Sequence, residues 1–211
     1  MKVIVVKSNL KETLSVVAGG TKENQNLPVL KTVLCEAEQN IITLTTTNLE
    51  IAIRASLPGK VIEGGSVAIP LTVFSAVVNN LQSERLNLEK KKEGLEITTD
   101  NYHAHIQGFP AKEFPIIPKP KNTTVFFEVS GALLRDCFAQ TTTSAQASDV
   151  RPELNSVLFN FSLDNLKLVA TDSFRLSEKT LTKNQFQTKT EEDLRALVPL
   201  KTTQELFKTI K

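Results

Sequence analysis

The sequence has no tryptophan, one tyrosine and only two cysteines, Cys35 and Cys137, among its 211 residues. Two cysteines form neither a disulfide framework nor a cysteine-rich metal site, so we expect two buried thiols. The eight glycines include no glycine-rich phosphate-binding motif. The apolar run at the N-terminus is too short for a signal peptide, and no later run could span a membrane. These absences predict a protein of the reducing cytoplasm without a cofactor.

Charges of the two signs nearly balance, because 25 Lys and Arg face 23 Asp and Glu. A net charge of +2 does not by itself indicate a nucleic-acid-binding protein. A protein of this composition that meets DNA must concentrate its positive charge on one face. The hydrophobic share of 40% is that of an ordinary globular protein, and we expect most of the eleven phenylalanines to serve its core.

The chain contains an internal repeat. Three segments of the first half overlay three of the second: Leu27–Leu34 on Arg151–Leu158, Leu44–Asn48 on Leu168–Asp172, and Val67–Leu71 on Ala196–Leu200. A repeat of this length indicates a duplicated domain, since solenoid units have only about 20–50 residues. Prolines crowd the segment from Pro110 to Pro120, which predicts an extended connector and a domain boundary near Pro118. The predicted domains are therefore residues 1–118 and 119–211.

Each domain shows the order strand, helix, strands, helix. In the first, Ser8 is expected to cap a helix and Pro70 to open a second one. In the second, Ser130 and Pro199 have these roles. The predicted strands cover 2–6, 30–37, 41–47, 49–55, 67–69, 85–89, 95–99 and 102–107, then 125–129, 156–161 and 166–171. This order predicts an α+β fold with two helices packed on antiparallel β-sheets in each domain.

The second domain is shorter than the first. Nothing after Ile210 corresponds to the segment from Ser83 to Ile117. A sheet without its last strands exposes an edge, so we expect the second domain to be truncated at its C-terminal end.

The segment from Leu168 to Leu176 reads as two short strands that meet at a turn formed by Asp172 and Ser173. Beside the turn stand Phe174, Arg175 and Leu176, a cluster that can line a groove for a peptide. The alternative is an ordinary hairpin with a core phenylalanine and a surface arginine.

Evidence for catalysis is sparse. His103 and His105 are spaced to share one face of a strand, as a metal pair would, but only Asp100 among acidic residues is near in sequence. Asp172, Ser173 and Arg175 lack the positioned base that a nucleophile needs. We expect a surface strand at the histidines, no metal site, no catalytic residues and no enzymatic activity.

Several of these segments resemble the bacterial sliding clamp, the beta subunit of DNA polymerase III. The segments that carry the resemblance are Leu27–Leu30, Leu44–Glu50, Gly108–Pro115, Asp149–Arg151 and above all Ala170–Leu176, which is close to a family signature. The resemblance covers the whole chain as the first clamp domain and most of the second, and leaves the third domain absent.

The resemblance implies the function of a processivity factor. Two chains of three domains form a homodimeric ring whose helices face double-stranded DNA and whose sheets form the rim. Replicative DNA polymerase subunits and the clamp loader bind through short peptide motifs. Topological enclosure replaces tight base contacts, each of which contributes about 1–3 kcal/mol of discrimination and would stall sliding.

The resemblance also assigns residues. The peptide groove would be lined by Leu154, Thr171, Ser173, Phe174, Arg175 and Leu176. The DNA-facing residues would be Lys11, Lys22, Arg135, Lys201 and Lys208. Without the third domain the groove would be half built, so neither ring closure nor full-strength peptide binding is expected of these 211 residues.

Two departures from the family pattern affect these assignments. Other members often have basic residues on the second helix, whereas Pro70–Leu81 carries no charge, so DNA contact from the first domain is weakened. Ser173-Phe174 stands where other members have Gly-His, which changes the expected shape of the groove. A non-catalytic, duplicated-domain interaction module without DNA binding remains the alternative function.

Overall fold

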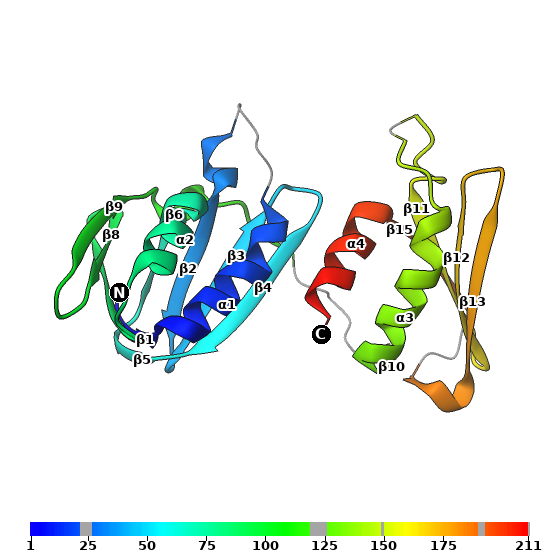
Figure 1. Cartoon of the computed structure of the whole chain (residues 1–211), viewed down its shortest axis with the longest axis horizontal. Coiled ribbons are helices and arrows are strands. Elements are labelled where there is room, and N and C mark those ends of the chain that lie inside the picture. Colours follow the sequence, from blue (N-terminus) through cyan, green and yellow to red (C-terminus); the bar gives the residue numbers. More distant parts are fainter. Residues whose placement is uncertain (22–26, 119–125, 149, 190–192, 211) are drawn as a thin grey trace. The chain divides into compact units, whose positions relative to one another are not determined.

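The computed structural model describes residues 1–21, 27–118, 126–148, 150–189 and 193–210, and the chain divides into two compact units, Met1–Pro118 and Lys119–Lys211 (Figure 1). No helix in these ranges is long and apolar enough to cross a membrane.

Unit 1 consists of two antiparallel sheets and a pair of helices. Its strands are β1 (Lys2–Val6), β2 (Thr32–Glu38), β3 (Ile41–Thr47), β4 (Ala52–Pro58), β5 (Lys60–Glu63), β6 (Gly65–Pro70), β7 (Arg85–Lys91), β8 (Gly94–Thr98) and β9 (His103–Gln107). The sheet orders are β4-β3-β2-β6 and β5-β1-β7-β8-β9. The helices α1 (Lys7–Val17) and α2 (Leu71–Asn80) pack against each other, α1 also on β3 and β4, and α2 on β6 (Figure 1).

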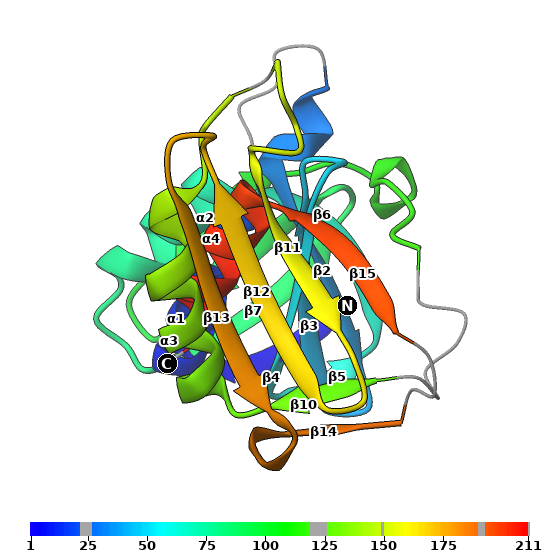
Figure 2. The same ribbon diagram turned by 90° about the vertical axis from the view of Figure 1, so that its right-hand side faces the viewer.

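Unit 2 repeats this plan with fewer strands. Its strands are β10 (Phe127–Val129), β11 (Ser156–Phe161), β12 (Asn165–Thr171), β13 (Leu176–Thr182), β14 (Phe186–Thr188) and β15 (Leu194–Pro199), and its helices are α3 (Gly131–Thr141) and α4 (Leu200–Thr209). Figure 2 shows its main sheet face-on, in the order β13-β12-β11-β15. The helices again pack together, α3 on β12 and β13, and α4 on β11 and β15.

The two main sheets have the same topology and the same register. Thr32 of β2 pairs with Pro70, the last residue of β6, and Ser156 of β11 pairs with Pro199, the last residue of β15. In both units the helix follows that proline directly. The repeat seen in the sequence is therefore a structural duplication, confirmed strand by strand.

The second sheets differ in extent. β1 pairs with β5 on one side and with β7 on the other, whereas β10 pairs only with β14 within the described ranges. Unit 2 thus has no described counterpart of β7, β8 and β9.

Each unit has its own hydrophobic core. In α1 the buried residues Leu10, Thr13, Leu14 and Val17 recur at helical spacing, as predicted for an amphipathic helix. In unit 2 the core includes Phe138, Val157 and Leu168. Both cysteines are buried, as predicted, and burial raises the pKa of the Cys35 thiol to about 12. That thiol is therefore protonated at neutral pH and unreactive.

Some predicted boundaries were wrong. Ser130 caps α3, since its hydroxyl accepts from the Leu133 N–H at 3.2 Å, but Ser8 caps nothing because β1 continues directly into α1 at Lys7. Glu84 takes over that role: its carbonyl accepts from the Lys7 N–H at 2.7 Å. Pro70 and Pro199 are the residues before their helices and not the first helical residues.

Other differences concern strands and short turns. β4 begins at Ala52, because residues 48–51 form a turn. The short strands β5 and β14 were not predicted, and neither was β15, while the predicted hairpin reached only the first residue of β13. The described residues also include 3₁₀ turns at Ala18–Gly20, Pro28–Lys31, Ala111–Glu113, Thr142–Ser144 and Lys183–Gln185. The proline-rich connector lies partly outside the described residues, with Ala111–Glu113 forming its one described helical turn.

Candidate functional site

The predicted groove segment forms a turn between β12 and β13 that is held by its own side chains. The Thr171 hydroxyl donates to the Arg175 carbonyl at 2.7 Å and accepts from the Ser173 N–H at 3.2 Å. Asp172 Oδ1 accepts from the N–H groups of Phe174 and Arg175 at 3.0 and 2.9 Å. The sequence thus encodes this turn through a threonine and an aspartate that bond to nearby backbone.

The turn requires a left-handed residue at Ser173, whose φ is +75°. This conformation costs a non-glycine residue about 1 kcal/mol or more, so the surrounding hydrogen bonds must hold it. As a consequence Phe174 points away from the protein, with 98% of its surface exposed. The interpretation of this segment as a hairpin with a core phenylalanine is therefore wrong.

Asp172 also orients the arginine. Its Oδ2 accepts from Arg175 Nε at 2.9 Å, and 65% of the Arg175 side chain remains exposed. The N–H groups of Arg175 and Phe174, and then the Arg175 side chain, hold the pKa of the Asp172 carboxyl below its usual value. At neutral pH the turn therefore presents an oriented guanidinium beside an exposed ring.

The other predicted groove residues lie at the same end of the sheet. Leu176, the first residue of β13, is 64% exposed. Leu154 is half-buried, and its carbonyl accepts from the Gln146 N–H at 3.0 Å in the loop before β11. Ser144, close to Gln146 in sequence, bonds to Ser177 of β13 at 2.6 Å. Figure 2 shows this loop and the β12–β13 turn at one end of the unit.

Unit 1 contains the same turn between β3 and β4. The Thr47 hydroxyl donates to the Ile51 carbonyl at 2.9 Å and accepts from the Leu49 N–H at 3.0 Å. Asn48 Oδ1 accepts from the N–H groups of Glu50 and Ile51 at 2.9 and 2.8 Å. Leu49 has φ +74°, one degree from Ser173.

The predicted DNA-facing residues fall into two groups. Lys11 on α1 and Lys201 on α4 are exposed, and no salt bridge of theirs occurs among the described residues. Lys208 on α4 is also exposed, but it pairs with Glu205 at 2.8 Å. Lys22 lies outside the described residues.

Arg135 has a structural contact in addition to its charge. It donates to the Ile210 carbonyl, the C-cap of α4, at 2.8 Å, and its guanidinium lies 5.1 Å from the centre of the Phe207 ring. In unit 1 Lys7 of α1 donates to the Leu81 carbonyl, the C-cap of α2, at 2.6 Å. Each unit thus ties its first helix to the end of its second, a role that the sequence did not suggest for Lys7 or Arg135.

The histidine pair lies on the edge strand β9. His103 Nε2 is 3.9 Å from Glu96 Oε2 on the neighbouring strand β8. Within the described part of the chain no group of three or more His, Cys, Asp or Glu side chains is placed to hold a metal ion.

Comparison with known proteins identifies the family. The profile of the DNA polymerase III beta subunit, N-terminal domain, matches residues 1–118, and that of the beta subunit, central domain, matches residues 128–211. The chain belongs to the DNA polymerase III beta subunit family. The resemblance noted in the sequence is thereby confirmed, together with the α+β fold of repeated units.

Curated relatives in this family are called beta sliding clamps. That of Vibrio cholerae is 28% identical over 180 residues, which are 84% of this chain and 49% of the relative, and that of Chlamydia muridarum is 26% identical over 179 residues, with the same coverage. The DNA polymerase sliding clamp of Bacillus subtilis shares the fold, with a TM-score of 0.93, at 21% identity over all of this chain and 57% of that one. The chain spans about half the length of the curated relatives that it matches.

Proposed function

We propose that this chain is part of a DNA polymerase processivity clamp, which encircles duplex DNA and tethers replication proteins without catalysing a reaction. Membership of both units in the beta subunit family carries the proposal. Units 1 and 2 are assigned as clamp domains 1 (1–118) and 2 (119–211), with the third domain outside these 211 residues. Such a protein works in the cytoplasm, where bacterial replication takes place, and closes its ring as a homodimer of full-length chains.

The helices supply the surface toward DNA. A sliding protein needs phosphate contacts that exchange rapidly, and these are provided by mobile lysines more readily than by fixed arginines. Lys11 and Lys201, both exposed, suit this role, and Lys22 belongs to the same assignment. Lys208 is partly neutralised by Glu205, and Arg135 is held at the end of α4, so both make smaller contributions.

The turn between β12 and β13 supplies one wall of the peptide-binding groove. Phe174 and Leu176 offer apolar surface to the anchors of a bound peptide, and Arg175 offers donors to its carbonyl or carboxylate oxygens. Asp172 is a positioning residue, because it fixes the guanidinium without facing the peptide. Leu154 and Thr171 complete this wall, and Ser173 fixes the direction in which Phe174 points.

DNA binding is tested by fluorescence anisotropy with a labelled 25-base-pair duplex at several salt concentrations. The pair Lys11→Glu and Lys201→Glu should weaken binding equally for all sequences and reduce the salt slope by about one unit for each lost phosphate contact. Lys112→Glu, an exposed charge reversal in the connector and outside α1, α2, α3 and α4, is the control. Equal binding by the helix variant and the control would favour an interaction module without DNA binding.

Peptide binding is tested with a labelled peptide that ends in Leu-Phe. Arg175→Ala or Leu176→Ala should weaken it about tenfold, which corresponds to about 1.4 kcal/mol. Lys183→Ala, a similarly exposed change at the opposite end of β13, should have no effect. Unchanged affinity in both groove variants, with unfolding curves like that of the wild type, would contradict the assignment of this turn.

A further inference from the structure

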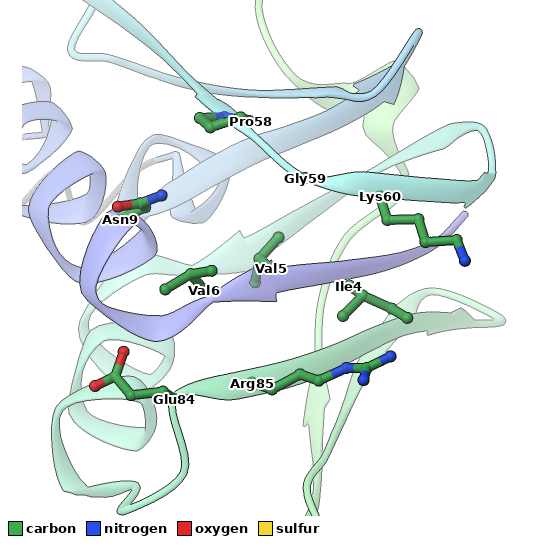
Figure 3. Close-up of a pocket in the computed structure, with 9 residues that line it drawn as sticks. All are labelled: Ile4, Val5, Val6, Asn9, Pro58, Gly59, Lys60, Glu84 and Arg85. Carbon is green, nitrogen blue, oxygen red and sulfur yellow. The ribbon is translucent and has the colours of Figure 1, made fainter.

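A hollow on the solvent side of the five-stranded sheet of unit 1 has no role in the proposed clamp function. It has a volume of about 510 Å³ and lies where β1, β5 and β7 run beside the start of α1 (Figure 3). The corner between β4 and β5, at Pro58 and Gly59, forms one rim.

The floor of this hollow is unusually apolar for an outward strand face. Side chains alternate along β1, so that Val3 and Val5 lie in the core while Ile4 and Val6 face outward, with Val6 46% exposed. At the positions equivalent to Ile4 and Val6, unit 2 has Glu128 and Ser130, which are polar, as expected for the solvent-facing side of an antiparallel sheet. Unit 1 therefore exposes apolar side chains where its duplicate does not.

Two cations flank this apolar strip. Lys60 of β5 is opposite Ile4, and Arg85 of β7 is opposite Val6, so both share the outward face. Figure 3 shows the Ile4 side chain between their charged ends, both of which lie toward the right of the view. Both are exposed, and the salt bridges among the described residues include neither.

The acidic residue of the hollow is already engaged. Glu84 lies at the opposite end from the two cations, and its carboxylate accepts from the Ser8 N–H at 3.4 Å at the start of α1. The hollow is thus polarised, with an apolar middle, a cationic end, and a carboxylate that is directed to the helix start. A ligand with a negative group next to an apolar one would complement it.

We propose that this hollow binds an extended acidic segment of a partner protein, in which carboxylates contact Lys60 and Arg85 and an adjacent apolar side chain covers Ile4 and Val6. A peptide fits this hollow better than a small molecule does. Small-molecule sites usually enclose most of the ligand surface, whereas this hollow is open on one side.

The test is a titration of the ¹⁵N-labelled chain with the peptide acetyl-Asp-Asp-Leu-Ile-Gly-Ser-amide, followed by NMR. Amide shifts should change at Ile4, Val6 and Lys60, and affinity should fall as salt rises. The double variant Lys60→Glu and Arg85→Glu should weaken binding at least about tenfold. Lys31→Glu, an exposed charge reversal in unit 1 away from the hollow, should bind as the wild type does.

Control peptides separate the two parts of the recognition. Replacing both aspartates by asparagine, or Leu-Ile by Ser-Ser, should each reduce affinity. Absence of binding, equal binding of the asparagine peptide, or shifts confined to residues 173–176 of the other unit would overturn the proposal. Since Arg175→Ala leaves this site intact, loss of binding in that variant would also count against it, independently of the clamp function.

Discussion

The β3–β4 turn of unit 1 and the β12–β13 turn of unit 2 have the same backbone but different surfaces. In both, a threonine and an Asn or Asp side chain make the same four hydrogen bonds, and the third residue has φ near +75°. Unit 2 adds an arginine held by its aspartate, whereas unit 1 has Ile51 there and an asparagine, Asn48, whose buried Nδ2 has no hydrogen-bond partner among the described residues.

This comparison separates the residues that build the turn from those that give it a function. The first two positions and the left-handed residue fix the path of the chain, and they are similar in both units. The last two positions differ between the units, since Phe174 and Arg175 are both exposed whereas Ile51 is half-buried. A shared hydrogen-bond pattern therefore does not predict a shared binding role, and unit 2 alone combines an exposed ring with an oriented cation.

The largest effect on stability is expected when Asn48 of unit 1 is replaced by aspartate, the residue found at the equivalent position, Asp172, in unit 2. Asn48→Asp buries a carboxylate that lacks the arginine of unit 2, since Ile51 stands at that position, and it should lower the free energy of unfolding by about 2–3 kcal/mol at pH 7. Ile51→Arg in the same chain supplies the missing partner and should recover part of the loss. Urea unfolding of both single variants and the double variant measures the coupling energy; additive effects would show that the two turns are not equivalent.

A smaller effect separates the two threonines. Thr47→Val and Thr171→Val each remove one donated and one accepted hydrogen bond, but Thr47 is buried and Thr171 is half-buried. We expect losses of about 2 kcal/mol for Thr47→Val and about 1 kcal/mol for Thr171→Val, because water replaces the lost bonds only where it has access. Thermal unfolding monitored for each unit provides the comparison, and the reverse order would contradict it.

Glycine at the left-handed position should stabilise both turns by a similar, still smaller amount. Leu49→Gly and Ser173→Gly remove the steric cost of positive φ and should each add about 0.5–1 kcal/mol. Leu49→Ala and Ser173→Ala keep that cost and serve as controls. If glycine destabilises one turn, the side chain there makes a contact that outweighs its backbone strain.

The smallest effect is a pH dependence that only unit 2 should show. Because the folded-state pKa of Asp172 is lowered, its contribution to stability is present above the unfolded-state value of about 3.9 and is lost as the pH falls through the folded value. NMR titration of the Asp172 carboxyl carbon should give a midpoint below 3.9. The stability difference between the wild type and Asp172→Asn should shrink as the pH falls toward 2; a constant difference would contradict the shift.

Sequence patterns predicted the elements with long hydrophobic periodicity. The buried face of α1 and the strands β3, β11 and β12 were found within one residue, because burial of one face fixes the register. β5 and β14 were missed because each has only three or four residues, too few to establish alternation. Ser8 was taken for a cap because the acceptor that replaces it, Glu84, is 76 residues away.

The candidate site was predictable in its residues but not in its geometry. Thr171, Asp172 and Ser173 predict a turn from their residue types. The outward direction of Phe174 depends on the positive φ of Ser173, and residue types alone do not predict that angle. The helix ties of Lys7 and Arg135 were unpredictable because their acceptors are backbone carbonyls that any residue provides. Whether Lys11 and Lys201 meet DNA stays a prediction.

The helix ties have a consequence for how the two units can diverge. Their acceptors at Leu81 and Ile210 are main-chain atoms, so mutation of either residue leaves the acceptor in place. Only the donor needs to be retained, and it can move along the first helix, since Lys7 opens α1 whereas Arg135 is the fifth residue of α3. After duplication, the donor in one unit can therefore change from the flexible ammonium group of Lys7 to the planar guanidinium group of Arg135, one helical turn further along. The first helix stays bonded to the end of the second throughout such a change.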